Sequence, residues 1–374
     1  MKSPLRSAGL TSMLRTALRR SRVGCAGLAC VAGAFAADKP PAIKVTKTPA
    51  TATSGAVVKI EGIFGTRYTA HADVADNTTF DLTGMAWTPK PTHPVVTAFS
   101  VGEQSKPPTN ITILGGTVNG SIPLEWSWEL THAFGGAGFY TVGAGLHRLE
   151  GARIHNMHDG WRPRETPLFR ARSYPNSGKF LMRACYLTGI RDDAIENDEF
   201  MPGDIEDCLI DGTWTFLSEQ NETVNGVRYL KVPAIGPNED PEIRVTRTLV
   251  RLARTNGDPG LGTWFKFHGY ETPNHKIVIT DSVFAAGEQP RNGWKLLNFH
   301  QNATFKGTNY LLWLGEPGKY GATKPKGVTF LEGGAAKAKW HALRNEWLMA
   351  HGYEPVSADD WNPMKAAVAA PKRR

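Results

Sequence analysis

Short apolar phrases of similar composition recur along this chain. The residues that occupy the same position in these phrases are Val118, Ile154, Leu187, Ile210, Val250 and Phe284. They lie 36, 33, 23, 40 and 34 residues apart. A solenoid produces such recurrence because each coil places an inward side chain over that of the previous coil. The uneven intervals predict coils that carry insertions, which gather on one face of a solenoid.

The segments around these phrases have the composition of β-strands. Runs of Val, Ile, Leu and Thr, such as those in 110–116 and 276–284, are punctuated by Gly, Asn and Asp. No stretch with helical periodicity between them is long enough for a βαβ crossover. Parallel strands without crossover helices are joined by coiling the sheet, so the pattern predicts an all-β, right-handed parallel β-helix. A non-solenoid β-sandwich is the alternative fold.

The pattern divides the chain into four segments. We expect a signal peptide over 1–36, a flexible leader or N-terminal cap over 37–74, the β-helix over 75–332, and a C-terminal helix and tail over 333–374. The helix is predicted because Trp340, Leu343, Trp347 and Leu348 have helical spacing and a glycine follows at 352. We expect this helix to cap the open end of the solenoid.

The first 36 residues have the composition of an export signal. They hold six Lys and Arg residues and no acidic residue, and they end in an apolar run from Val23 to Ala36. That run of about 14 residues is shorter than the roughly 20 that span a bilayer. Arg19-Arg20 suggests twin-arginine export. We therefore expect an exported protein, periplasmic or secreted, with no stable membrane anchor after signal removal.

Removal of the signal changes the charge and the cysteine content. The formal charge of +8 includes the six charges of residues 1–36, which leaves +2 for the remaining chain. A nearly neutral chain argues against a nucleic-acid partner. Cys185 and Cys208 remain and lie one coil apart, where they form either a disulfide or two stacked buried thiols. No Cys/His spacing resembles a zinc site.

Candidate chemistry lies in loops that follow the same strand in neighbouring coils. In-register coils are separated by about 4.8 Å. Polar residues at equivalent positions therefore approach one another. The residues expected to share one groove are Asp159, Asp192 or Asp193, Glu219 and Lys266.

Carboxylates are dense between residues 192 and 199. Alternation along a strand places Ile195 inward and Glu196 and Asp198 outward, while a bulge can reverse Asp192 or Asp193. Neighbouring carboxylates repel unless they are neutralised. The cluster therefore predicts a calcium site with Glu196 and Asp198 as ligands, or an acid and base pair for glycosidic cleavage. The third interpretation is a structural surface held by Arg162, Arg164, Arg183 and Arg191.

Aromatic and basic residues near these loops suggest sugar binding. The chain has 11 Trp residues, and flat rings in turns can stack on a sugar face, although each ring can equally fill the core. The residues we assign to substrate binding are His158, Trp161, Arg162, Arg164, Arg191, Trp214 and Trp264.

Residues 75–332 resemble the pectin-lyase-like group of right-handed β-helix proteins, which includes pectate lyases and polygalacturonases. Polygalacturonases carry Asn-Thr-Asp, Asp-Asp, Gly-His-Gly and Arg-Ile-Lys motifs in successive coils. Here Asn-Met-His-Asp-Gly (156–160) resembles the first motif, and Asp192-Asp193 matches the second. The last two motifs are absent, and Lys-Phe-His-Gly (266–269) stands in a comparable place.

The resemblance implies a protein that cleaves or binds a polysaccharide, with a uronate-containing polymer expected, in a groove across the coils. We assign the catalytic roles to Asp159, Asp192, Asp193, Lys266 and His268. In a hydrolase, Asp192 or Asp193 donates the proton and Asp159 activates water. In a lyase, the acidic cluster holds calcium and Lys266 or an arginine is the base. A non-catalytic surface or carbohydrate-binding β-helix with a structural acidic cluster is the alternative function.

Overall fold

The computed structural model describes residues 43–361 apart from 67, 71–73, 89–96, 103–106, 135, 166–177, 199–200, 221–222, 225–226, 229–241, 255–259, 269–275, 291–296, 298 and 300–302. The expected signal peptide, residues 1–36, lies outside the described residues. All of the elements belong to one compact unit, Pro40–Arg374.

The described part of the chain is mostly β-structure. Its strands are β1 (Lys44–Thr48), β2 (Val57–Phe64), β3 (Tyr68–Ala70), β4 (Thr78–Trp87), β5 (Phe99–Val101), β6 (Thr109–Leu114), β7 (Thr117–Asn119), β8 (Ala137–Glu150), β9 (Arg153–His155), β10 (Asp159–Glu165), β11 (Lys179–Arg183), β12 (Tyr186–Glu196), β13 (Gly203–Glu206), β14 (Leu209–Gln220), β15 (Thr223–Val224), β16 (Val227–Arg228), β17 (Glu242–Thr246), β18 (Leu249–Leu252), β19 (Phe265–His268), β20 (Lys276–Thr280), β21 (Val283–Ala286), β22 (Ala303–Lys306), β23 (Asn309–Trp313) and β24 (Val328–Glu332). Two helices accompany them, α2 (Trp128–Phe134) and α4 (Gly333–Ala350).

Parallel pairing between successive coils builds the fold. Among the described strands, only the β1–β2 and β15–β16 pairs are antiparallel. All other strand pairs are parallel, and each strand pairs with the equivalent strand of the next coil, as β9, β12, β14 and β18 do in turn. This is the arrangement of an all-β parallel solenoid. It differs from a β-sandwich, whose two sheets are antiparallel.

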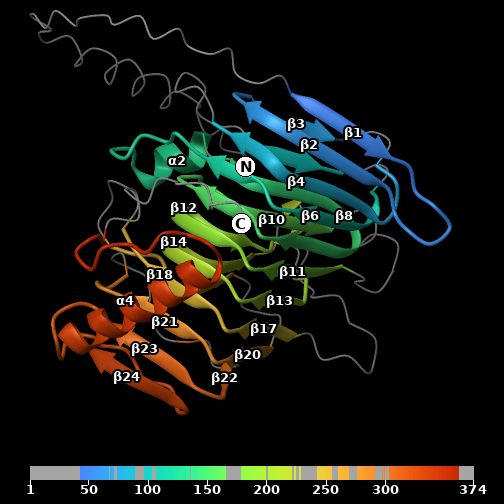
Figure 1. The fold of residues 1–374 in the computed structure, drawn as a ribbon. Helices are drawn as coiled ribbons and strands as arrows, with labels where there is room; N and C mark the ends of the chain where they lie inside the picture. The colour runs from blue at the N-terminus through green and yellow to red at the C-terminus, as the bar shows by residue number, and fades with distance from the viewer. Residues whose placement is uncertain are drawn as a thin grey trace, which may run out of the picture. The chain divides into compact units, whose positions relative to one another are not determined.

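The strands fall into three rows (Figure 1). Row 1 contains β7, β9, the first halves of β12 and β14, and then β18, β21, β23 and β24. Row 2 contains β3, β5, the first half of β8, β10, the second halves of β12 and β14, and β19. Row 3 contains β6, the second half of β8, β11, β13, β17, β20 and β22.

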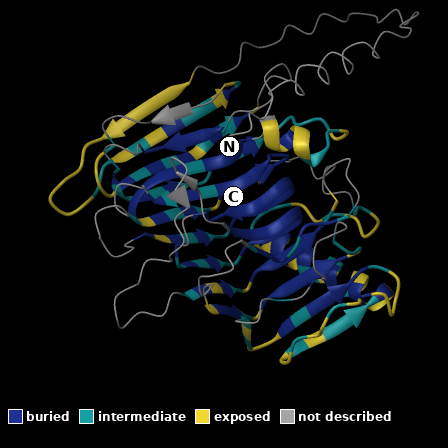
Figure 2. Cartoon of the chain, turned by 180° about the vertical axis from the view of Figure 1, so that it is seen from behind, coloured by how far each residue is buried: buried dark blue, intermediate teal, exposed yellow. Residues whose placement is uncertain are grey.

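The inward side chains of row 1 form the ladder that the sequence pattern predicts. Val118 pairs with Ile154, Ile154 with Leu187, and Leu187 with Ile210. The ladder continues through Val250 to Phe284. All of these side chains are buried in one core, and Figure 2 shows burial along the parallel strands. The predicted register is therefore confirmed.

The solenoid begins earlier than the sequence suggests. Strand β2 pairs in parallel with β4, with Val57 opposite Thr79 and Phe64 opposite Trp87. Residues 57–64, which lie in the segment expected to be a flexible leader or N-terminal cap, therefore pair with the coils. Strand β1 adds an antiparallel edge that is exposed along its whole length and carries Lys44 and Lys47. Lysines on an edge strand disfavour further strand pairing.

Helix α4 packs along the side of the coils and does not cap their end, as Figure 1 shows. It covers outward apolar side chains of row 1, which include Leu209, Leu249 and Val283. Trp340 and Trp347 of the helix pack with these side chains in a hydrophobic cluster that is separate from the core inside the coils. An 18-residue helix is about 27 Å long, enough to cross several layers. Among the described residues, neither helix is long and apolar enough to cross a bilayer.

Cys185 and Cys208 lie in adjacent coils and are both buried free thiols. Leu209 pairs with Tyr186, which places the two preceding cysteines next to each other in the stack. Of the two arrangements expected from the sequence, the structure contains the stacked thiols.

Candidate functional site

Row 2 brings four of the predicted catalytic residues together on its outer side. Asp159 begins β10, Asp192 and Asp193 lie in β12, and Lys266 lies in β19. The register of β12 against β14 shifts between Ile190 and Asp193. Such a bulge re-aims side chains. It allows the two consecutive aspartates to face the same lysine.

Lys266 links the two consecutive aspartates. Its Nζ lies 2.8 Å from Oδ2 of Asp193 and 3.5 Å from Oδ1 of Asp192. Lys266 stands opposite Ser218, which in turn stands opposite Glu196. The lysine therefore reaches across one coil to the carboxylates of another, and all three linked side chains are buried.

Arg162 forms a second centre of charge pairing in the same cluster. Its Nε lies 2.6 Å from Oε2 of Glu196, and its Nη2 lies 3.8 Å from Oδ2 of Asp198. Its Nη1 lies 3.9 Å from Oδ2 of Asp159. Glu196 and Asp198 thus have a guanidinium as their cationic neighbour. The outward direction predicted for both carboxylates agrees with these contacts.

Helix α2 supplies two residues that the sequence analysis did not assign to the site. His132 lies with its ring centroid 5.4 Å from that of His158, whose Nε2 is 3.5 Å from Oδ2 of Asp192. Trp128 stacks on His132 at 4.5 Å and lies 6.1 Å from Trp214. No local motif distinguishes this seven-residue helix, because its role depends on the strand against which it packs.

The cluster carries more acidic than basic groups. Five carboxyl side chains, from Asp159, Asp192, Asp193, Glu196 and Asp198, are buried. Within the described residues, the ion pairs of these groups involve two permanent cations, Lys266 and Arg162. Burial of unmatched charge is costly, so protons or another cation must offset the excess.

This environment raises the pKa of two of the aspartates and lowers that of the third. Burial raises the pKa of Asp159 to about 7, and the neighbouring Asp192 and Asp193 add to the rise. Burial and Asp192 likewise raise the pKa of Asp193 to about 7. Burial also acts on Asp192, but Lys266 and His158 outweigh it and lower the pKa of that carboxyl. The carboxyl of Asp192 is therefore the most readily ionised of the three, and those of Asp159 and Asp193 bind protons more readily than a free aspartate does.

The pKa values of the remaining groups of the cluster are also shifted. Burial and carboxylate neighbours raise the pKa of Glu196 and Asp198 well above their usual range. Burial alone would lower the pKa of Lys266, but Asp193 and Asp192 outweigh burial and raise it. Burial lowers the pKa of His158 to about 4. The lysine is therefore a firmly held cation and the histidine is neutral.

Two of the tryptophans expected to bind substrate fill the core. Trp161 belongs to an inward ladder of row 2, where it pairs with Phe139 on one side and Ile195 on the other. Trp264 is fully buried and stacks on Phe299 at 5.9 Å. Neither ring faces solvent, in contrast to the expectation from the sequence. Trp161 continues a run of inward apolar side chains, which only the register reveals.

The other assigned residues take different places. Arg191 is buried and its Nη2 donates a hydrogen bond to the Pro123 carbonyl. Arg164 donates to the Tyr140 hydroxyl at 3.2 Å. Trp214 lies beside Trp128 at the α2 side of the cluster. The side chain of His268 lies outside the described residues, so its catalytic assignment stays a prediction.

Two groups of side chains have a geometry that can hold a metal ion. Ligand atoms of Asp159, Asp192 and Asp193 lie within 4.8 Å of one another, and so do those of His132, His158 and Asp192. Carboxylate oxygens suit calcium and imidazoles suit transition metals. Glu196 and Asp198, the ligands expected from the sequence, instead contact Arg162.

Comparison with known proteins found no matching family model, no similar curated protein and no similar solved structure.

Proposed function

We propose that this chain is an exported, right-handed parallel β-helix protein that hydrolyses a polysaccharide at the cluster of Asp159, Asp192, Asp193 and Lys266. The resemblance to pectin-lyase-like proteins places a uronate-containing polymer first among the substrates to test. The leader composition supports export.

One observation carries the proposal. Oxygens of Asp159, Asp192 and Asp193 lie within 4.8 Å of one another, while the pKa of Asp192 is lowered and those of the other two are raised to about 7. Glycosidic hydrolysis needs a protonated carboxyl and an ionised one on either side of the bond. Environments that separate the pKa values of neighbouring carboxyls assign these roles.

The roles follow from the protonation states. Asp192 is the carboxylate that takes a proton from the attacking water or attacks the anomeric carbon itself. A proton from the Asp159 and Asp193 pair passes to the glycosidic oxygen, which leaves with that proton. Oδ2 of Asp159 and Oδ1 of Asp193 are buried and have no hydrogen-bond partner among the described residues, so a substrate hydroxyl or a water that entered the cluster would find acceptors there. These roles differ from the sequence-based assignment, in which Asp192 or Asp193 donates the proton and Asp159 activates water.

The solvent-facing side of the cluster suits a sugar. His132 is exposed, and the Arg162 side chain is 30 % exposed above buried carboxylates. Trp128 stacks on His132, while Trp214 lies behind Trp128 and is buried. Aromatic rings and a guanidinium at the rim of a carboxyl cluster supply the stacking and hydrogen-bonding groups that a pyranose uses.

Two alternatives have less support. A lyase with Lys266 as its base requires a neutral amine, whereas Asp192 and Asp193 raise the pKa of this lysine. A non-catalytic protein with a structural acidic cluster is favoured by the Arg162 pairing with Glu196 and Asp198. That pairing does not explain the buried oxygens of Asp159 and Asp193 that lack a hydrogen-bond partner.

The test is incubation of the purified chain, without residues 1–36, with polygalacturonate, alginate and xylan, with and without calcium. Reducing ends that appear without ultraviolet absorbance, and that disappear in Asp192→Asn, support hydrolysis. Calcium-dependent absorbance selects the lyase. Retained cleavage in a folded Asp192→Asn protein contradicts the proposed site.

A further inference from the structure

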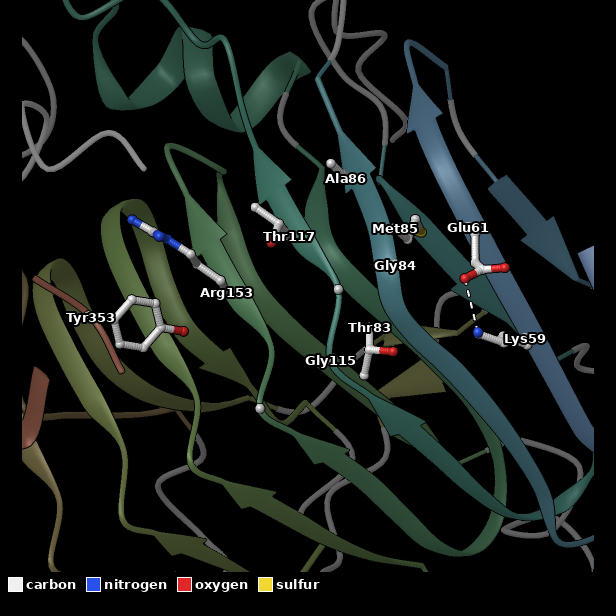
Figure 3. A pocket seen from close by; sticks show the side chains of 12 residues that line it. Lys59, Glu61, Thr83, Gly84, Met85, Ala86, Gly115, Thr117, Arg153 and Tyr353 are labelled. Carbon is white, nitrogen blue, oxygen red and sulfur yellow. Dashed lines mark ion pairs between the residues drawn. The ribbon is translucent and has the colours of Figure 1, made fainter. Parts of the chain in front are cut away.

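A groove of about 470 Å³ lies over the first coils, on the outer side of β2, β4, β7 and β9 (Figure 3). Its lining includes Ala86, Thr117 and Arg153, which pair with one another in successive coils. None of its lining residues belongs to the acidic cluster, which is built by row 2. The groove therefore requires an explanation of its own.

Helix α4 explains why the groove is open. The outward position occupied by Arg153 continues through Tyr186, Leu209 and Leu249 in the later coils. Helix α4 covers those three apolar side chains. The helix ends at Ala350, and the chain then returns to the sheet. The first coils present smaller or polar side chains at this position and are left uncovered by α4.

Glycines and small residues keep the floor of the groove close to the backbone. A Cβ atom at Gly84 would lie 2.9 Å from Cγ of Glu61, and one at Gly115 would lie 2.9 Å from Cα of Thr83. Gly115 also has a φ of 69°, which side chains other than glycine rarely adopt. A flat floor of this kind lets a ring approach the sheet closely.

Polar groups stand at both ends of the floor. At one end the Arg153 guanidinium lies over the rings of Tyr186 and Tyr353, at 5.3 and 5.2 Å. Figure 3 shows the Tyr353 hydroxyl directed toward the floor. At the other end Lys59 and Glu61 form an ion pair of 2.9 Å. The groove thus offers donors and acceptors around a flat centre.

These properties select one class of ligand. A helix needs large apolar contacts, which the floor lacks, and a metal ion needs several oxygen ligands, whereas Glu61 is the lone carboxylate of the lining. The lining sets Lys59 and Arg153 against Glu61, a small excess of positive charge that suits a carboxylated sugar and is too small for the dense phosphates of nucleic acid. A saccharide has a flat ring with hydroxyls at its edge, and it matches a small-residue floor with polar ends.

We propose that this groove is a second saccharide-binding site, which holds a stretch of polymer away from the acidic cluster. The identity of the ligand rests on the proposed function, but binding in the groove does not require cleavage. Three layer spacings of about 4.8 Å separate β2 from β9, so the groove extends over several coils. It would raise the affinity for long chains and leave the cleavage of short ones unchanged.

The experiment compares equilibrium binding of polygalacturonate, alginate and xylan to three folded proteins. All carry Asp192→Asn to prevent cleavage. One adds Ala86→Phe and Thr117→Phe, which fill the groove. A matched control adds Thr329→Phe, an exposed position farther along the same outward line of row 1. We expect affinity for a bound polymer to fall at least about tenfold in the filled protein and to stay unchanged in the control.

A second variant covers the case in which the double substitution does not fold. Tyr353→Phe retains the ring over Arg153 and removes one hydroxyl, so we expect a fall of about fivefold in affinity. Equal affinities in both groove variants and in the control would overturn the proposal, as would the absence of binding to any of the three polymers. If groove-dependent binding appears but the protein without Asp192→Asn cleaves nothing, the groove stands and the hydrolase proposal fails.

Discussion

Two buried charge clusters on different rows of the solenoid have opposite balances of acidic and basic groups. Under α4, Asp211 lies between Arg251 and Arg344, so that one carboxylate meets two guanidiniums. Arg344 also donates to the carbonyls of Ser357 and Asp360. The row 2 cluster instead has five carboxyls and two permanent cations.

The comparison separates an ion-pair cluster that joins two elements from the proposed active site. Under α4 one carboxylate pairs with two guanidiniums, and the pair of Asp211 with Arg344 joins the helix to the sheet over 133 residues of sequence. The groups of row 2 leave carboxyl oxygens without partners and must hold protons. Buried charges with matched partners hold elements together, whereas unmatched ones have shifted pKa values suited to proton transfer.

The largest expected effect is on catalysis. Asp192→Asn removes the ionised carboxylate and should lower kcat of polysaccharide cleavage by about 10³-fold, within the range of general acid and base catalysis. Asp211→Asn is the matched control, since the same change in the other cluster should leave kcat of the folded protein within about twofold. Initial rates from reducing ends measure both. Equal losses in the two proteins would remove the distinction between the clusters.

The second effect is on stability. Asp211→Ala leaves two guanidiniums under α4 without their carboxylate and should lower the free energy of unfolding by about 3–5 kcal/mol. Urea denaturation followed by tryptophan fluorescence measures it. Arg244→Ala, which breaks an exposed pair with Asp204, is the control and should cost less than about 1 kcal/mol. If Asp211→Ala lowered the free energy of unfolding as little as Arg244→Ala does, the packing of α4 would not depend on the ion pairs of Asp211.

The third effect depends on pH and tests the raised pKa values. Asp159 has a pKa of about 7 in the folded chain against 3.8 as its ordinary value, so the folded state binds more protons between these values. Stability is highest below about pH 4 with respect to this group and falls as pH rises through 7. Each pKa unit corresponds to about 1.4 kcal/mol, so the total is a few kcal/mol.

Asp159→Asn should flatten this pH dependence, because an amide does not titrate and retains the oxygen that accepts from the Asp193 amide. Unfolding free energies at pH 5 and pH 8 measure the change. An unaltered difference between the two pH values would contradict the assignment of a raised pKa to Asp159.

The smallest expected effect is that of a chelator. Hydrolysis by the carboxyl groups should continue in EDTA at a rate within about twofold of that without it, since its proton transfers use side chains alone. Loss of activity in EDTA, restored by calcium, would instead assign the Asp159, Asp192 and Asp193 group to a metal. The Asp211 cluster already has two cations and should not bind calcium, so it should contribute no change in the melting temperature of the protein when calcium is added.

The sequence carried enough information to predict the coils. Aligned apolar residues from Val118 to Phe284 predicted the register because each inward position must stack on the previous one. The same argument placed Asp159, Asp192 or Asp193, Glu219 and Lys266 in one groove. The structure brings the aspartates and Lys266 together, whereas the buried Glu219 stands opposite Phe267 and accepts a hydrogen bond from Asn197. Periodicity is a local property repeated along the chain, and it is therefore readable without long-range contacts.

The position of α4 was not predicted, although a signal for it exists. Leu209-Ile210, Leu249-Val250 and Val283-Phe284 place two apolar residues at adjacent strand positions. One of each pair must face outward, and an outward apolar line needs a cover. Attention to both faces of these strands would have predicted a helix along the side. Trp161 and Trp264 were assigned to substrate binding and are buried in the core for a related reason, since the register decides which positions of a strand face inward.

The sequence by itself thus determined the repeating strands, the register of row 1 and the approach of the catalytic candidates. Only the tertiary structure decided which carboxyls have raised and which have lowered pKa values, that α2 brings His132 and Trp128 to the cluster, and where α4 leaves a groove. The physical reason is that stacking follows from a short repeat, whereas burial and charge balance depend on all the groups around a side chain, which come from distant parts of the chain.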